Sequence, residues 1–244
     1  MPLLTPKQYV QLREAYCYNS PNCNFSIIQM GKLKNTGNFL GIFATDVPLH
    51  YSNGINLRRF ELICQDVFRD CSHATQNNIL LPGRLKNLKN ISVAIVYWKM
   101  SSQGGRAPHK VQNMLNKWTN NTASQLINAY RNRQMSQFRI GGVRIPTATA
   151  FMRFLFPNDF GIMDSRVVGK HTQPKSITTL SVRSDGYIND TIQNVRKYSE
   201  EYIPFLRSEA KWLNDQNVTL QEVDHLGNVF DFPFRACDIE MALF

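Results

Sequence analysis

Several features of secreted or membrane-spanning chains are scarce in this sequence. The 244 residues include five cysteines, an odd number that is too small for a disulfide-stabilised scaffold. The longest mostly apolar stretch, Ile91–Trp98, has eight residues, whereas a membrane-spanning helix needs roughly 20. The first residues, Met1–Tyr9, lack the charged and then apolar pattern of a signal peptide. These absences predict a soluble, cytoplasmic protein with no membrane partner.

Metal-binding and nucleotide-binding motifs are also missing. No two histidines are three or four residues apart, and no Cys-x-x-Cys pair occurs, so a zinc site is not indicated. There is no Walker loop, no Gly-x-Gly-x-x-Gly and no Gly-x-Ser-x-Gly. The sequence contains no internal repeat and no low-complexity linker. We therefore expect no cofactor.

Apolar residues and positive charge are abundant. Hydrophobic residues make up 43% of the chain and aromatic residues 11%, which is enough for a sizeable core. Lysine and arginine number 28 against 18 aspartate and glutamate, a net charge of +10. Such an excess favours a polyanionic partner, and nucleic acid is the first candidate.

Helical periodicity dominates from Leu57 onward and predicts a mainly α protein. A small β-hairpin is possible near the N-terminus, around Asn35–Gly37. Leu85–Trp98 has the length of a helix, although its β-branched residues leave a strand possible. Pro204 predicts a kink or a restart within a long helical stretch. The other predicted helices are 57–67, 108–118, 122–131, 146–156, 192–213 and a short one opened by Asp238–Glu240.

One stretch carries more information than composition does. The residues Ile140-Gly141-Gly142-Val143-Arg144-Ile145-Pro146-Thr147-Ala148 form a turn followed by an apolar helix, and Ile162-Met163-Asp164-Ser165-Arg166 follows that helix. This pattern resembles the helix-hairpin-helix DNA glycosylase superfamily, the endonuclease III-like enzymes. In that family the hairpin reads roughly Leu-Pro-Gly-Val-Gly-x-Lys-Thr-Ala, and an aspartate follows the lysine position by 18 residues. Pro146 and Asp164 are separated by the same interval.

The resemblance implies a two-lobed helical fold with three regions. Residues 1–55 would be an N-terminal extension of mixed loop and strand that packs on the C-terminal lobe. Residues 56–170 would form a helical lobe holding the hairpin and the catalytic aspartate. Residues 171–244 would complete the second lobe. Residues 85–170 carry the specific part of the resemblance.

The resemblance also implies roles for the hairpin and the aspartate. Asp164 would be catalytic. A glycine-rich turn before a helix start can approach DNA closely and offer N–H groups to a phosphate. The backbone carbonyls of Phe138, Ile140 and Val143 would hold a structural monovalent cation. The residues that would contact DNA are Gly141, Gly142, Arg144, Thr147, Arg166 and Lys170.

Other residues are candidates for the base pocket or for the wedge that fills the gap left by an extruded base. Trp98 is a possible stacking platform, although a core position is the alternative. Lys99 and His109 could face the pocket, or for His109 simply the surface. Gln103 and the pair Gln76 and Asn77 are rival wedge residues, and loop chemistry does not decide between them.

Two departures from the family pattern affect the expected chemistry. Pro146 stands where members with lyase activity have their Schiff-base lysine, which implies a monofunctional enzyme unless Lys99, Lys110 or Lys170 supplies the amine. Arg144 replaces the second hairpin glycine, which would cost about 1 kcal/mol if that position needed a positive φ. The four-cysteine loop of some members is missing, so no iron–sulfur cluster is expected.

The resulting hypothesis is a DNA N-glycosylase, a hydrolase acting as a monomer on double-stranded DNA. It would extrude a damaged or modified base and leave an abasic site. The role would be base-excision repair, or defence against phage DNA that carries modified bases such as hydroxymethylated or glucosylated cytosine. The alternative is a non-catalytic helix-hairpin-helix DNA-binding module. A nuclease is less favoured, because we find no acidic metal-binding cluster in the sequence.

Overall fold

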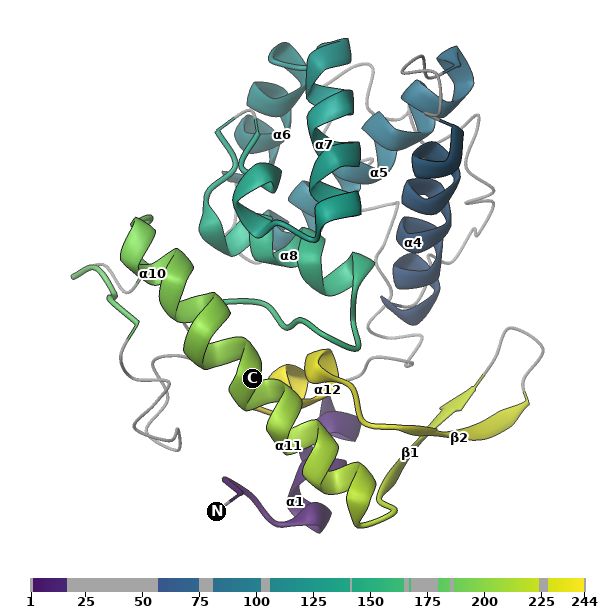
Figure 1. Ribbon diagram of the computed structural model, residues 1–244, viewed down its shortest axis with the longest axis vertical. Helices are drawn as coiled ribbons and strands as arrows, with labels where there is room; N and C mark the ends of the chain where they lie inside the picture. Colours follow the sequence, from purple (N-terminus) through teal and green to yellow (C-terminus); the bar gives the residue numbers. More distant parts are fainter. Residues whose placement is uncertain are drawn as a thin grey trace. The chain divides into compact units, whose positions relative to one another are not determined.

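The protein is mainly helical, and its described part includes a two-stranded antiparallel sheet (Figure 1). The computed structural model describes residues 2–16, 57–74, 81–101, 106–140, 142–164, 167, 180–184, 187–223 and 228–243. The mainly α class predicted from the sequence is confirmed. The possible N-terminal β-hairpin lies outside the described residues. Among the described helices, none is both long and apolar enough to cross a membrane.

The chain divides into two compact units. The central unit comprises residues 20–155, and the terminal unit comprises residues 1–19 and 156–244. This division differs from the predicted one, because the boundary follows Leu155 rather than Lys170. Asp164 therefore belongs with the C-terminal elements and not with the hairpin.

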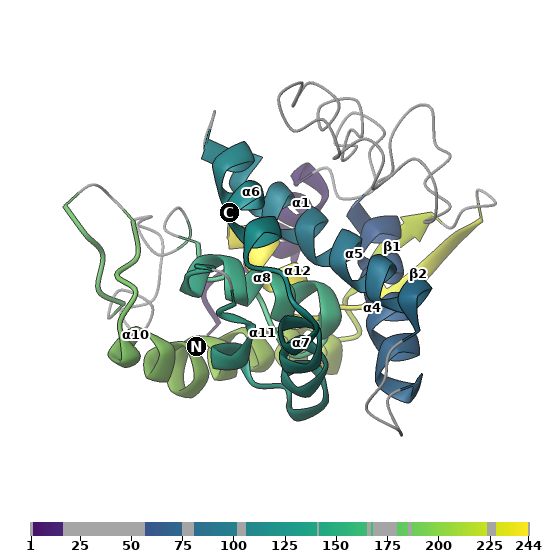
Figure 2. The ribbon, with the colours of Figure 1, turned by 90° about the horizontal axis from the view of Figure 1, so that it is seen from above.

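The central unit is a helical bundle. Its elements are α4 (Leu57–Ala74), α5 (Pro82–Ser101), α6 (Arg106–Asn116), α7 (Asn120–Asn132), the 3₁₀ turn η3 (Met135–Phe138) and α8 (Ile145–Leu155). Helices α4 and α5 pack side by side (Figure 2). The predicted helices of this region are confirmed, and Leu85–Trp98 is helical, within α5. A capping box between Thr119 and Thr122 starts α7.

Helix α8 is mostly apolar and is buried along its whole length except at Pro146. Its one charged residue, Arg153, is buried too and lies 3.4 Å from the Glu61 carboxylate. The aromatic side chains of α8 join two clusters of the central core. Phe151 stacks on Phe138 with ring centroids 5.2 Å apart. Phe154 meets Phe60 and Trp98 edge to face, at 4.9 and 4.8 Å. These contacts fix the helix that follows the hairpin.

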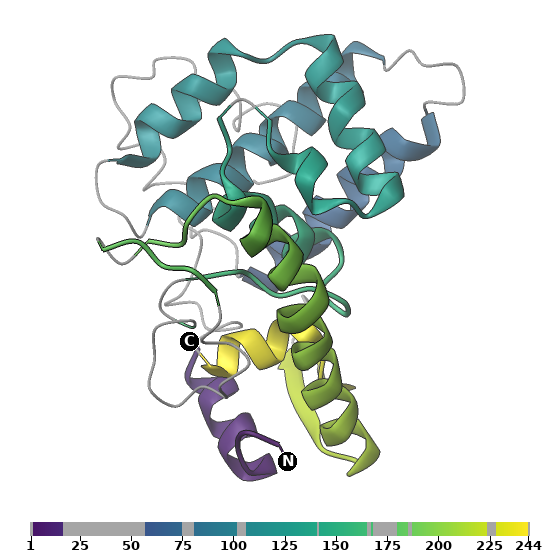
Figure 3. The same ribbon diagram turned by 60° about the vertical axis from the view of Figure 1, so that its left-hand side comes forward.

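The terminal unit begins with a helix that the sequence prediction of mixed loop and strand over residues 1–55 missed. Helix α1 (Pro6–Ala15) starts at Thr5, which forms a capping box with Gln8, and Pro6 occupies the first helical turn. Both features were readable in the sequence, because Thr-Pro-x-Gln is a helix-start pattern. Helix α1 lies beside α12 (Ala236–Leu243) (Figure 3).

The remaining elements of the terminal unit form a rod and a hairpin. Helix α10 (Ile192–Lys197), the π-helical turn η4 (Tyr198–Tyr202) and α11 (Ile203–Asp215) follow one another as a continuous rod (Figure 1). Pro204 lies in the first turn of α11, directly after the π-helical turn, at the place where the sequence predicts a kink or a restart. Strands β1 (Thr219–Val223) and β2 (Val229–Pro233) pair antiparallel, with Gln221 opposite Asp231.

Buried ion pairs connect α1, α12 and β1. The Asp238 carboxylate accepts hydrogen bonds from Arg13 Nε and from Arg235 Nε, both at 2.8 Å. Glu222 of β1 lies 3.9 Å from Arg235. Burial by itself would raise the pKa of Asp238, but the charges of Arg235 and Arg13 outweigh it and hold that pKa well below its ordinary value. Asp238 therefore links α1 to α12 in the interior, beyond its predicted role as a helix-start acid, and Arg235 extends this network to β1.

Candidate functional site

The predicted hairpin forms a tight turn in the central unit. The Val143 N–H donates to the Ile140 carbonyl at 2.8 Å, and Gly142 has φ +84°. A positive φ at the third position of such a turn favours glycine, because a Cβ atom would be strained there. Gly142 is exposed, and no atom lies within 4 Å of the position a Cβ would take. At Gly142 the turn thus presents bare backbone to a ligand. Gly141 lies outside the described residues.

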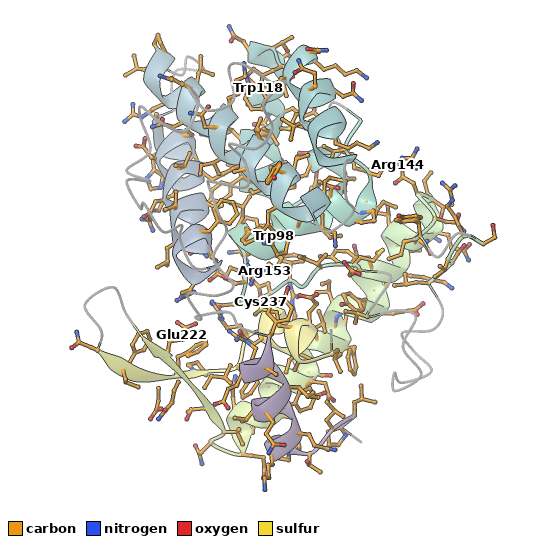
Figure 4. The ribbon with its side chains drawn as sticks, turned by 180° about the vertical axis from the view of Figure 1, so that it is seen from behind. Trp98, Trp118, Arg144, Arg153, Glu222 and Cys237 are labelled. Carbon is orange, nitrogen blue, oxygen red and sulfur yellow. The ribbon has the colours of Figure 1, made fainter. Side chains whose placement is uncertain are left out.

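Arg144 follows the turn and immediately precedes α8. Its carbonyl accepts from the N–H groups of Thr147 and Ala148, and its side chain is exposed at the edge of the central unit (Figure 4). The described residues other than glycine with positive φ are Arg133 and Asn217. The strain considered for arginine at the second glycine position therefore does not arise. An exposed cation at a helix start is suited to a phosphate contact.

Thr147 is in a different environment from the one predicted for a DNA-contacting residue. Only 4% of its surface is exposed, and its N–H already donates to Arg144. Its side chain packs in the core because this part of α8 is buried on all sides. We therefore correct this assignment, and place Thr147 among the residues that fix α8.

The three predicted cation-binding carbonyls border the same turn. The Phe138 carbonyl accepts from Ile140 N–H at 2.9 Å, and the Ile140 carbonyl accepts from Val143 N–H. Each carbonyl oxygen has a second lone pair, so these bonds leave room for a cation ligand. The cation site remains a prediction.

Asp164 lies in a part of the chain, residues 156–164, that is tied to several elements of the terminal unit. Asp164 itself is 6% exposed. The Tyr198 hydroxyl donates to the Gly161 carbonyl at 2.9 Å, and the Tyr202 hydroxyl donates to the Ile162 carbonyl at 3.0 Å. Further bonds to this segment run from Cys237 N to Pro157 O, from Ala236 N to Asn158 O and from Arg207 Nε to Asp159 O. The carboxylate is therefore carried on a backbone whose course is fixed.

The two tyrosines belong to the π-helical turn η4, which the sequence prediction did not find. Both rings are buried, and their centroids are 5.9 Å apart. Burial raises the pKa of both phenols well above the ordinary value, and the nearby Glu240 charge raises them further. The Asp164 charge acts in the same direction on Tyr202. Both hydroxyls consequently remain protonated donors, and a π-turn is a feature often found near functional sites.

Gly161 gives this segment its close packing, and we expect Gly161→Ala to destabilise the protein. An added Cβ would lie 2.5 Å from Leu206 Cδ1 and 2.8 Å from Glu240 Cβ. Urea unfolding should show a loss of about 1–3 kcal/mol. The control is Gly83→Ala in α5, where nothing lies within 4 Å and alanine favours the helix. Equal stability of the two variants would contradict this packing.

The other predicted site residues divide into those the structure describes and those it does not. Trp98 is half-buried and lies against Phe154, which agrees with its alternative core assignment. Lys99, in α5, is only 6% exposed, so it is a buried residue. His109 lies in α6, with its side chain outside the description. The other predicted site residues that lie outside the described part of the chain are Gln76, Asn77, Gln103, Arg166 and Lys170.

Charge is divided unequally between the two units. The central unit has 17 lysine and arginine residues against four acidic residues, a net charge of +13. The terminal unit has 11 against 14, a net charge of −3. Residues 71–158, which include α5 to α8 and the hairpin, contain 12 basic residues and no aspartate or glutamate. The unit with the hairpin thus has the charge suited to a polyanion, whereas the unit with Asp164 has a small net negative charge.

Comparison with known proteins assigns neither a family nor a function to the chain. Neither a family model, nor a curated protein, nor a solved structure matches the chain.

Proposed function

We propose that this protein is a monofunctional DNA glycosylase that hydrolyses the bond between a base and its deoxyribose. The observation that carries the proposal is the placement of Asp164. It is a carboxylate on a segment anchored by two buried tyrosines, and it comes after a glycine hairpin and a buried helix in the order and spacing of the glycosylase pattern.

The hairpin would hold the DNA backbone. The exposed turn at Gly142 and the Arg144 side chain supply close approach and a positive charge. Phosphate contacts of this kind bind DNA without reading its sequence. The +13 charge of the central unit supports the same partner through long-range attraction. The target nucleotide would be extruded from the duplex, which costs least where the base is damaged or mispaired.

Asp164 would act on the extruded nucleotide. As the C1′–N bond breaks, its electron pair leaves with the base and the sugar gains oxocarbenium character, which a fixed carboxylate stabilises. Water then forms the new C1′–O bond, and Asp164 can accept the proton that this water loses. The released base takes up a proton from solvent. The products are a free base and an abasic site.

Pro146 bears on the fate of the DNA strand once the base has been excised. It stands in the first turn of α8 at the position of the lyase lysine, and proline has no amine with which to form a Schiff base. We therefore propose that the strand stays intact after the base has left.

Base release from DNA tests the proposal. Wild-type protein is incubated with several genomic DNAs, including modified phage DNA, and released bases are identified by mass spectrometry while abasic sites and strand breaks are counted. We expect one class of altered base, an equal number of abasic sites and no strand breaks. An ordinary damaged base would support repair, and a phage-specific modified base would support defence. Duplex binding without base release from any DNA would favour the binding module instead.

A further inference from the structure

The exposed face of α7 lacks acidic residues. Four apolar residues of the helix are buried, and the residues that face solvent are Asn120, Asn121, Ser124, Gln125, Asn128, Arg131 and Asn132. Solvated helix faces usually mix both signs of charge. Amide, hydroxyl and guanidinium groups all hydrogen-bond to phosphate oxygens, and no carboxylate is present here to repel them.

The residue that ends α7 is unusual. Arg133 caps the helix in the left-handed conformation, with φ +50°, where glycine is the common choice. Its side chain is exposed. The neighbouring Arg131 is already tied to Ser72 through its Nε, 3.1 Å from the serine Oγ. Both arginines are exposed, and Arg133 lies between the face of α7 and the turn η3.

This face is continuous with the hairpin. Gln125 of α7 donates through Nε2 to the Gln137 carbonyl of η3 at 3.1 Å. The Arg139 N–H at the end of η3 donates to Ser136 O, and the hairpin turn begins at the next residue, Ile140. A duplex held by the hairpin could therefore extend along α7 without leaving the surface of the central unit.

We propose that the exposed face of α7, together with Arg133, forms a second contact surface for duplex DNA, beside the hairpin. This proposal rests on the proposed function, because it takes DNA as the partner. Arg133 contacts a phosphate, and its left-handed backbone directs the chain from α7 into η3. This surface increases the length of duplex that the protein contacts, and it does not recognise the base.

Two variants and two matched controls test this surface by duplex binding across a range of salt concentrations. Arg133→Gly should weaken binding about threefold to tenfold and reduce the salt slope by about one phosphate contact. Its Tm should not fall, since glycine accepts the left-handed conformation. Asn128→Glu should also weaken binding by repulsion. The controls are Asn217→Gly, which has the same backbone conformation, and Gln193→Glu, an exposed helical site; both lie in the terminal unit and should bind as wild type does.

The outcomes separate this proposal from the proposed function. If Arg133→Gly and Asn128→Glu bind like wild type while Arg144→Glu binds more weakly, the α7 surface is wrong and the hairpin assignment stands. If wild type does not bind duplex DNA, both are wrong. Tighter binding of single-stranded RNA than of duplex DNA of equal length would also overturn the α7 assignment.

Discussion

Asp164→Asn is expected to lower the single-turnover rate of base excision by about 10³-fold or more, with duplex affinity unchanged. Asparagine has nearly the same shape but carries no charge, so it cannot stabilise an oxocarbenium-like sugar or accept a proton from water. The hairpin that would hold the DNA belongs to another part of the chain, so binding should persist. The measurement is a rapid-quench time course on the DNA whose altered base is released by wild type.

Asp159→Asn is the matched control for this variant. Asp159 lies in the same segment, and its carboxylate is 3.6 Å from Arg207. Removing that charge should leave the excision rate within about threefold of wild type, because a partly exposed ion pair contributes little. An active Asp164→Asn variant would show that the catalytic assignment is wrong. A loss of activity accompanied by a large fall in Tm would instead assign Asp164 a structural role.

Asp238→Asn should cost about 3–5 kcal/mol of unfolding free energy at neutral pH. The substitution leaves the buried guanidinium groups of Arg13 and Arg235 without the carboxylate that they share. Asp215→Asn is the control, because Asp215 pairs with Lys211 on the surface, where both side chains are more than half exposed. Urea unfolding at pH 7 measures both. A change below about 1 kcal/mol for Asp238→Asn would contradict the proposed importance of this network.

The ion pairs of Asp238 also predict that the stability of the protein depends on pH. The pKa of Asp238 is lowered in the folded chain, whereas in the unfolded chain it is near 3.9. Its stabilising contribution is therefore complete above that pH and is lost progressively as the pH falls toward the folded pKa. The stability difference between wild type and Asp238→Asn should narrow below about pH 4. A difference that stayed constant down to pH 2 would contradict the ion-pair account.

Local patterns predicted the local structure well. The helices of the central unit follow from periodicity, and the turn at Gly142 follows from a glycine pair before an apolar helix. Helix α1 was also readable from its capping residues and was missed because the residues after it suggested loop and strand. These features depend on neighbours along the chain, which the sequence displays directly.

Features that depend on distant contacts were not predicted. The π-turn that directs Tyr198 and Tyr202 onto residues 161 and 162 differs from an α-helix by one hydrogen-bond step, and periodicity does not reveal it. The burial of Thr147 follows from the packing around α8 and not from its motif position. The division of charge, in contrast, can be read from the sequence, because residues 71–158 contain 12 basic residues and no acidic residue.

The most direct test of the central claim asks whether Asp164 recognises positive charge on the sugar. Two duplexes differ at one position, which carries either a neutral tetrahydrofuran or a cationic pyrrolidine in place of the nucleotide's sugar and base. Transition-state analogues bind at least about 10²-fold more tightly than ground-state ligands, so wild type should prefer the cationic duplex by about that factor at fixed salt. Asp164→Asn should lose the preference. Equal affinity of wild type for the two duplexes, or a preference that survives in Asp164→Asn, would contradict the account.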